Sequence, residues 1–117
     1  MARYTIGYKE IEDYPGYFVY EDGRVLALPS GSILKPILKK DGYSSVCLYR
    51  DKKQKYLKIH RLVAEAFIPN PMNKLFVNHI DFDRANNCLG NLEWVTSSEN
   101  ALHSARHGRN SKQKKFA

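Results

Sequence analysis

Alternating hydrophobic and polar positions near the start of the chain predict short β-strands joined by tight turns. Residues 17–20 and 24–28 are rich in aromatic, β-branched and aliphatic side chains, and they flank a Glu-Asp-Gly turn. Residues 33–38 are again apolar, but Pro36 cannot donate a backbone hydrogen bond and restricts that strand to a sheet edge. The first third of the chain therefore predicts an antiparallel hairpin with an edge strand.

A second hairpin is predicted from residues 43–50 and 55–59, with a loop over residues 51–54. Val46 and Leu48 share one face of the first strand, whereas the other face carries mainly tyrosine, serine, lysine and arginine. Lysine can anchor phosphate and tyrosine can stack on a base, so this second face is a possible nucleic-acid platform. The alternative is that the tyrosines only complete a small core.

Two helices are predicted in the second half. Residues 60–67 carry apolar side chains at helical spacing and end before a Pro-Asn-Pro segment. Thr96-Ser97-Ser98-Glu99 fits a capping box that starts a second helix, and Gly108 suits its C-terminal cap. His60 has two open interpretations: a ligand or phosphate contact, or a helix-start residue held by a carbonyl group.

The size of the chain, 117 residues, favours one domain with an adequate core. No apolar run approaches the length of a membrane span, and the first residues do not have the pattern of a signal peptide, so we expect a cytoplasmic protein without a membrane partner. Cys47 and Cys88 lack the paired spacing of a zinc site or a disulfide framework and are expected to be ordinary buried thiols.

The net charge of +7 is unevenly distributed along the chain. Residues 35–61 hold nine basic and two acidic side chains, and residues 106–117 hold five basic side chains and no acid. The segment between them is acidic overall. A lysine run can be only a solvated surface. Two basic regions on either side of one polar motif, however, favour a polyanionic partner, and double-stranded DNA is the obvious one.

The motif between the two basic regions begins with a mostly apolar, strand-like run at residues 76–80, which has His79 near its end. A turn rich in Asp and Asn follows, and then the capped helix. Near pH 7 an unperturbed histidine is mostly neutral and can accept a proton from water. The ordered set His79, Asn91 and Asn100, with spacings of twelve and nine residues, resembles the HNH endonucleases and their ββα-metal motif.

The N-terminal half also has a resemblance. Gly16-Tyr17-Phe18, Asp22-Gly23-Arg24-Val25, Ile33-Leu34-Lys35-Pro36, Asp41-Gly42-Tyr43 and His60-Arg61-Leu62-Val63-Ala64 resemble, in this order, modules that precede the HNH unit in phage and intron homing endonucleases. The resemblance implies an α+β fold: small antiparallel β-hairpins, then a ββα-metal unit. It divides the chain into a NUMOD4-like DNA-binding module (1–59), an HNH unit (60–108) and a basic tail (109–117).

The resemblance implies roles for the motif residues. His79 would be the general base, and the amide of Asn91 would fix the loop and the orientation of the imidazole. Asn100 would bind one divalent ion, Mg²⁺ or Mn²⁺. Asn78 stands where the family often has Asp and is expected to be a further ligand. His103 lies next to Asn100 on the same helix face and is expected to be the third ligand.

Two further positions carry expectations. Asp81 could assist metal binding, but a short acidic side chain after a strand more often caps a turn. Phe82 stands where the family usually has glycine. Phenylalanine does not easily adopt positive φ, so we expect this turn to differ in detail.

The resemblance implies a DNA endonuclease, nicking as a monomer or making double-strand breaks as a homodimer, with 5′-phosphate and 3′-hydroxyl products and no small-molecule substrate. The alternatives are a DNA-binding module that keeps the HNH frame without cutting, and an RNA-binding protein. The expected DNA contacts are the basic and aromatic residues Lys35, Lys39, Lys40, Tyr43, Arg50, Lys52, Lys53, Lys55, Arg61, Arg106 and Arg109.

Overall fold

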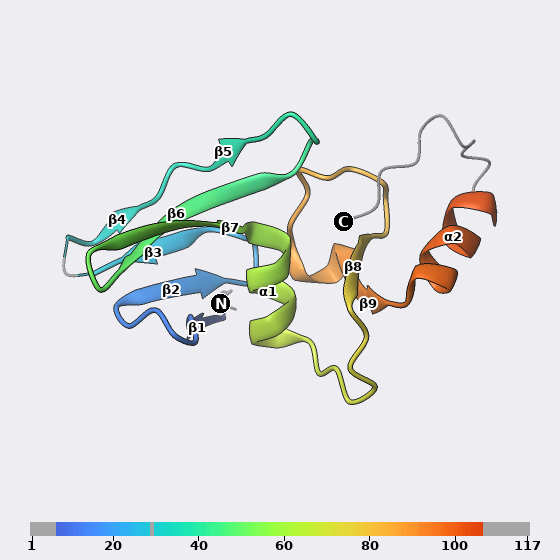
Figure 1. The fold of residues 1–117 in the computed structure, drawn as a ribbon, viewed down its shortest axis with the longest axis horizontal. Helices are drawn as coiled ribbons and strands as arrows, with labels where there is room; N and C mark the ends of the chain where they lie inside the picture. Colours follow the sequence, from blue (N-terminus) through green and yellow to red (C-terminus); the bar gives the residue numbers. More distant parts are fainter. Residues whose placement is uncertain (1–6, 29, 107–117) are drawn as a thin grey trace, which may run out of the picture.

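The computed structural model describes residues 7–28 and 30–106, which form three antiparallel sheets and two α-helices (Figure 1). This confirms the expected α+β class. The elements, in chain order, are β1 (Tyr8–Glu10), β2 (Tyr17–Tyr20), β3 (Val25–Ala27), β4 (Ser32–Ile33), β5 (Ile37–Leu38), β6 (Ser44–Arg50), β7 (Lys53–Lys58), α1 (Ile59–Phe67), β8 (Phe76–His79), the 3₁₀ helix η1 (Leu89–Asn91), β9 (Leu92–Val95) and α2 (Ser97–Arg106). No helix among the described residues has the length and apolar character needed to cross a membrane.

The first sheet has the strand order β1-β2-β3-β4 and contains the predicted N-terminal hairpin. Val19 pairs with Val25 across it, and both side chains are buried. The prediction of one strand over residues 33–38 is wrong. β4 pairs with β3, whereas β5 pairs with β6 in the second sheet, and Pro36 lies between them because it cannot continue a ladder of hydrogen bonds.

The second sheet, β5-β6-β7, contains the basic hairpin. The connection between β6 and β7 is only Asp51 and Lys52, shorter than the predicted loop, and their φ angles are +53° and +64°. Two consecutive residues with positive φ are typical of the tight turn whose twist matches that of paired strands. This turn makes the hairpin a compact projection with lysines at its tip.

A single hydrophobic core joins both halves of the chain. Helix α1 lies between the N-terminal sheets and the β8–β9 hairpin (Figure 1), and its residues Ile59, Leu62 and Val63 are buried there. The same core contains Val19 from the N-terminal sheet and Val77 from β8. The two sequence modules expected on either side of residue 59 therefore share one hydrophobic core among the described residues.

The β8–β9 hairpin is covered by α1 on one face and by α2 on the other (Figure 1). The capping box that predicts the start of α2 is confirmed: Thr96 Oγ1 accepts from the Glu99 amide at 3.1 Å, and Glu99 Oε1 accepts from the Thr96 amide at 2.9 Å. These bonds, and an ion pair from Lys74, hold the pKa of Glu99 below its ordinary value. The predicted cap at Gly108 lies outside the described residues.

Candidate active site

His79, the last residue of β8, is held in one orientation by an amide. Its Nε2 lies 2.8 Å from Oδ1 of Asn87, and both side chains are buried. Because the amide oxygen accepts, Nε2 carries the proton and Nδ1 is the nitrogen that remains for a water molecule. Burial lowers the pKa of His79, despite the opposing effects of Asn87 and of the nearby Asp81 and Asp83 carboxylates. The imidazole is therefore neutral near pH 7, as a general base must be.

A second imidazole packs against the first. The ring centroid of His60 lies 4.9 Å from that of His79 and 4.8 Å from that of Tyr43. His60 is 0% exposed, and neither ring nitrogen has a hydrogen-bond partner among the described residues. Burial, followed by the charges of its neighbours, lowers its pKa to about 3. His60 does stand in the first turn of α1, as one interpretation expected, but it is neither accessible to phosphate nor held by a carbonyl group.

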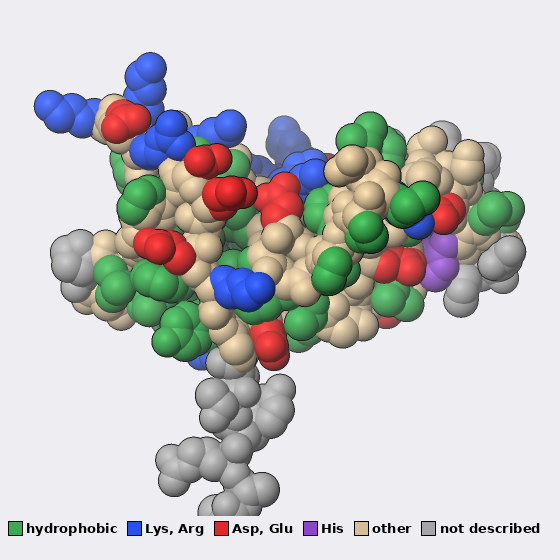
Figure 2. All heavy atoms as spheres, turned by 90° about the horizontal axis from the view of Figure 1, so that it is seen from below, with side chains coloured by type: hydrophobic (Ala, Val, Ile, Leu, Met, Phe, Trp, Pro, Cys, Tyr) green, Lys and Arg blue, Asp and Glu red, His purple; other side chains and the backbone are tan. Residues whose placement is uncertain are grey.

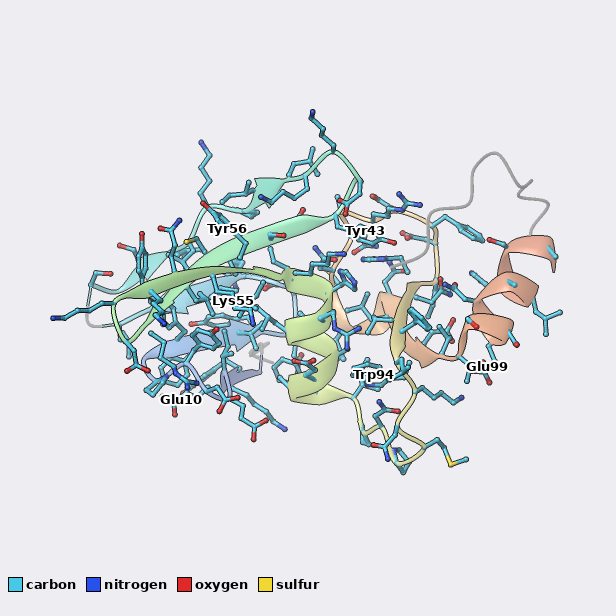
Figure 3. All side chains as sticks on the ribbon, viewed as in Figure 1. Glu10, Tyr43, Lys55, Tyr56, Trp94 and Glu99 are labelled. Carbon is cyan, nitrogen blue, oxygen red and sulfur yellow. The ribbon has the colours of Figure 1, made fainter. Side chains whose placement is uncertain are left out.

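Tyr43 requires a similar correction. Its side chain is 5% exposed and lies where the second sheet meets the loop after β8, away from the exposed Tyr56 (Figure 3). Lys58 and Arg84 lie over its ring, with centroid distances of 4.9 and 5.0 Å. Tyr43 therefore packs in the interior beside His79 and is not part of an exposed DNA-binding surface.

Asn91 fixes the loop between β8 and β9. Its Oδ1 accepts from the Asp81 amide at 3.0 Å, and its Nδ2 donates to Asp81 Oδ1 at 2.9 Å and to the Asn86 carbonyl at 3.0 Å. Asp81 also accepts from the Asp83 amide, so it caps the turn, which was the more frequent of its two expected roles. Hydrogen bonds from Asn86, Asp83 and Asn91 lower the pKa of Asp81.

Asn87 is the site residue that sequence reasoning missed. It, and not Asn91, contacts the imidazole of His79. The sequence shows two adjacent asparagines at this point, but only the path of the loop decides that the second one turns inward. Asn91 thus orients the loop, and Asn87 orients the ring.

Phe82 departs from the expectation for its turn, because it does adopt a positive φ of +67°. Its ring stacks on that of His103 with a centroid distance of 4.6 Å and an interplanar angle of 17°. His103 Nε2 lies 3.1 Å from the Ile80 carbonyl oxygen, to which it can donate. The stacking of Phe82 on His103 is favourable and so opposes the cost of the positive φ. The stacking and the contact with the Ile80 carbonyl together join α2 to the loop. His103 thus has a structural role here, and its metal ligation stays a prediction.

Asn78, on β8, and Asn100, on α2, are the two expected amide ligands, and both side chains are buried. Asn100 is 3% exposed, and its Oδ1 is buried without a hydrogen-bond partner among the described residues. An unpaired buried acceptor is costly unless something binds it, and amide oxygens are suitable ligands for hard divalent ions. The described residues contain no group of three or more His, Cys, Asp or Glu side chains that could hold a metal. The unpaired oxygen of Asn100 fits a divalent ion, and metal ligation by Asn78 and Asn100 stays a prediction.

Two of the expected DNA contacts make bonds within the protein. Arg61 donates to the Leu75 carbonyl at 3.0 Å and lies over the Trp94 ring. Arg50 donates to the Asp13 carbonyl at 3.0 Å and also pairs with Asp51. These guanidinium groups join elements of the fold, so DNA binding is not needed to explain them.

Unlike these two arginines, the lysines expected to contact DNA remain candidates because their side chains are exposed. Lys39 lies 4.4 Å from the ring centroid of Tyr56, which is itself exposed. Figure 2 shows Lys and Arg side chains projecting from the end of the molecule opposite α2. Arg106 ends α2, but its side chain and the whole of Arg109 lie outside the described part of the chain. The exposed lysines among the expected contacts are Lys35, Lys39, Lys40, Lys52, Lys53 and Lys55.

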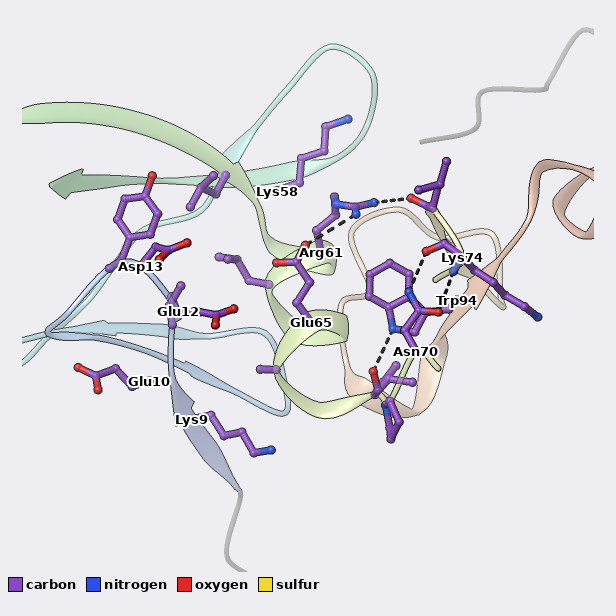
Figure 4. A pocket seen from close by; sticks show the side chains of 18 of the residues that line it. Lys9, Glu10, Glu12, Asp13, Lys58, Arg61, Glu65, Asn70, Lys74 and Trp94 are labelled. Carbon is purple, nitrogen blue, oxygen red and sulfur yellow. Dashed lines mark hydrogen bonds and ion pairs between the residues drawn. The ribbon is translucent and has the colours of Figure 1, made fainter. Parts of the chain in front are cut away.

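A pocket between β1, α1 and residues 69–75 lies apart from His79 (Figure 4). Arg61 is the one expected DNA contact that lines it, and Trp94 forms part of its wall. Acidic and basic side chains line it in equal number, so its charge does not favour a phosphate backbone. His79, Asn87, Asn91 and Asn100 are not among its lining residues, so the pocket is separate from the candidate active site.

Comparison with known proteins supports the sequence resemblance. Residues 57–102 match the family model described as HNH endonuclease. The chain is 41% identical over 93 residues to the uncharacterized HNH endonuclease L245 of Acanthamoeba polyphaga mimivirus, covering 80% of this chain and 28% of that protein. It is 36% identical over 102 residues to the DNA endonuclease I-HmuI of Bacillus phage SP01, covering 86% of this chain and 59% of that protein.

A solved structure of I-HmuI, described as showing DNA binding and cleavage by this HNH homing endonuclease, also resembles the fold. The TM-score is 0.82 at 34% identity, over 90% of this chain and 61% of that one. The chain thus spans less than two thirds of the length of these relatives. The matched segment runs from the end of β7 into α2 and includes His79, Asn91 and Asn100. This segment matches the HNH endonuclease family, and the fold of the chain is similar to that of an HNH homing endonuclease.

Proposed function

We propose that this chain is a metal-dependent HNH endonuclease that hydrolyses the phosphodiester bonds of double-stranded DNA. The observation that carries this proposal is the contact between His79 Nε2 and Asn87 Oδ1, together with the lowered pKa of His79, which would leave Nδ1 to accept a proton from an attacking water. The products would be a 5′-phosphate and a 3′-hydroxyl. The protein would act in the cytoplasm of the cell that contains its target DNA.

The chemistry begins with proton transfer from a water molecule to Nδ1 of His79. Asn87 Oδ1 stabilises the resulting imidazolium, because it continues to accept from Nε2 while the positive charge develops. The Asn91 and Asp81 bonds keep the loop that carries Asn87 in place. A divalent ion, Mg²⁺ or Mn²⁺, held by the oxygens of Asn78 and Asn100, would stabilise charge on the phosphate and on the leaving oxygen.

Contact with the DNA backbone would come from the exposed lysines of the second sheet. The hairpin β6–β7 projects away from α2, so a duplex lying along it could extend towards β8, the strand that ends at His79 (Figure 1). One site cuts one strand, so a monomer should nick, whereas a homodimer could cut both strands. The N-terminal sheets would form the DNA-binding module expected from the sequence.

The experiment is a plasmid cleavage assay with the purified chain. Supercoiled DNA is incubated with Mg²⁺ or Mn²⁺, with EDTA, and with the variants His79→Ala and Met72→Ala, the latter at an exposed side chain in the loop before β8. We expect relaxed circles that require both metal and His79, with Met72→Ala equal to the wild type.

A gel shift without cleavage under every metal condition, on both plasmid and the source genome's DNA, would refute the nuclease. It would favour the alternative, a DNA-binding module on an HNH frame, for which the absence of a carboxylate at position 78 is the supporting observation. Linear product would indicate paired sites.

A further inference from the structure

Glu93 contacts one of the two asparagines assigned to the metal. Asn78 and Glu93 are directly opposite each other in the β8–β9 ladder, and Asn78 Nδ2 donates to Glu93 Oε2 at 2.8 Å. Their neighbours Val77 and Leu92 are buried in the core against α1. Because side chains alternate along a strand, Asn78 and Glu93 are on the other face, which α2 covers.

We propose that Glu93 is a positioning residue for the metal site and acts through Asn78. Its carboxylate would hold the Asn78 amide with the oxygen available to the ion and would supply the negative charge that the ligands lack. This inference rests on the proposed function, because it concerns the same ion. It adds a residue that neither the family motif nor the sequence analysis assigns.

The first part of the argument concerns orientation. An asparagine amide has a donor end and an acceptor end of nearly the same size, so nothing in its shape decides which end faces an ion. A carboxylate only accepts, so Glu93 selects the donor end of Asn78. The acceptor end, Oδ1, is then the end of the amide that would face the ion.

The second part concerns charge. Asn78 and Asn100 carry no formal charge, and amide oxygens are weaker ligands for Mg²⁺ than carboxylates. A hydrogen bond to a carboxylate is charge-assisted, and it polarises the amide so that its oxygen becomes more negative. Groups that support ligands in this way typically change metal affinity about 10- to 100-fold.

Other acids near this face are already engaged. Glu99 forms an ion pair with Lys74 at 3.0 Å, and Asp81 accepts three hydrogen bonds within its loop. Glu93, by contrast, forms no ion pair with any lysine or arginine among the described residues. Its charge is therefore not neutralised locally and can act on the ion through Asn78.

The test measures binding of Mn²⁺ alone to the full chain, by electron paramagnetic resonance of the free ion at constant pH. Three variants separate the two effects: Glu93→Gln keeps an acceptor but removes the charge, Glu93→Leu removes both, and Asn78→Asp in the Glu93→Gln background returns a charge to the ligand itself. Urea unfolding of each variant gives its stability independently.

We expect Glu93→Gln to weaken Mn²⁺ binding about 10-fold and Glu93→Leu by more, towards about 100-fold. The double variant should regain at least the wild-type affinity, because the glutamine amide introduced by Glu93→Gln can donate to the new carboxylate. A structural role alone would lower stability and leave the Mn²⁺ affinity of the folded protein unchanged, and that result would overturn the proposal. If the wild-type chain itself binds no Mn²⁺, with or without duplex DNA, the proposed metal site fails and this inference fails with it.

Discussion

Lowering the pH from 7 to 5 should destabilise the protein through His60. This side chain is fully buried, has no hydrogen-bond partner among the described residues, and faces His79, Lys58 and Arg61. Its pKa is about 3 in the folded state, against an ordinary value of 6.5. Below pH 6.5 the unfolded chain takes up a proton that the folded protein does not bind, so stability falls as the pH falls and levels off near pH 3.

The magnitude follows from that difference of one proton. Each pH unit between the two pKa values costs about 1.4 kcal/mol, so the change from pH 7 to pH 5 costs about 2 kcal/mol. Domains of this kind are stable by about 5–15 kcal/mol in total, so the loss is a large and measurable fraction.

The assay is urea unfolding of the metal-free wild type and of His60→Leu at pH 7, 6 and 5. Leucine is similar in size and cannot titrate, so the variant should lose about 2 kcal/mol less than the wild type over this range. His79 remains in both proteins and contributes to both curves. If the two proteins lose stability in parallel, the assignment of a buried, neutral His60 is refuted.

Three further predictions concern the loop and the hairpin. Asn87→Ala should lower kcat about 10- to 100-fold with little change in DNA affinity, and Asn87→Asp, which keeps the acceptor to His79, should recover most of it in single-turnover cleavage; equal loss in both variants would exclude the acceptor role. Phe82→Gly should leave the unfolding free energy within about 1 kcal/mol of the wild type, because relief of backbone strain offsets the lost stacking on His103. In a His103→Ala background, where there is no stacking to lose, the same change should stabilise the protein. Urea unfolding of the four proteins gives the coupling energy, and a value of zero would contradict this reasoning. Changing three exposed hairpin lysines to alanine together should lower the affinity for DNA. The slope of log K against log salt concentration should become shallower by about 0.9 for each phosphate that these lysines neutralise. Fluorescence anisotropy measures both quantities, and an unchanged slope would show that the hairpin does not contact DNA. Those lysines are Lys52, Lys53 and Lys55.

Features with local causes could be predicted from the sequence. The capping box at Thr96 and Glu99 forms between residues three apart, and the spacing of apolar side chains is sufficient to predict α1. The order of His79, Asn91 and Asn100 likewise indicates where the strands and the final helix of the motif lie.

Features that depend on packing between distant segments could not be predicted. The sequence predicts Tyr43 on the polar face of a strand, but it directly precedes β6, and His60, His79 and Arg84 enclose it from other elements. Phe82, which has a positive φ, stacks on His103 because α2 brings this histidine to it from a later part of the chain. Alternation and propensity describe one element at a time, so neither can indicate such neighbours.

The shared core limits how this family can exchange parts. Helix α1 belongs by sequence to the nuclease segment, but its apolar face is completed by Val19 and Val25 from the first sheet. A chimaera joined at residue 59 would place this helix against foreign side chains and leave voids or clashes, each costing about 1–3 kcal/mol. Functional recombination among relatives should therefore retain the N-terminal sheets together with α1. The unit that must be kept together for folding is larger than the segment that the family model matches.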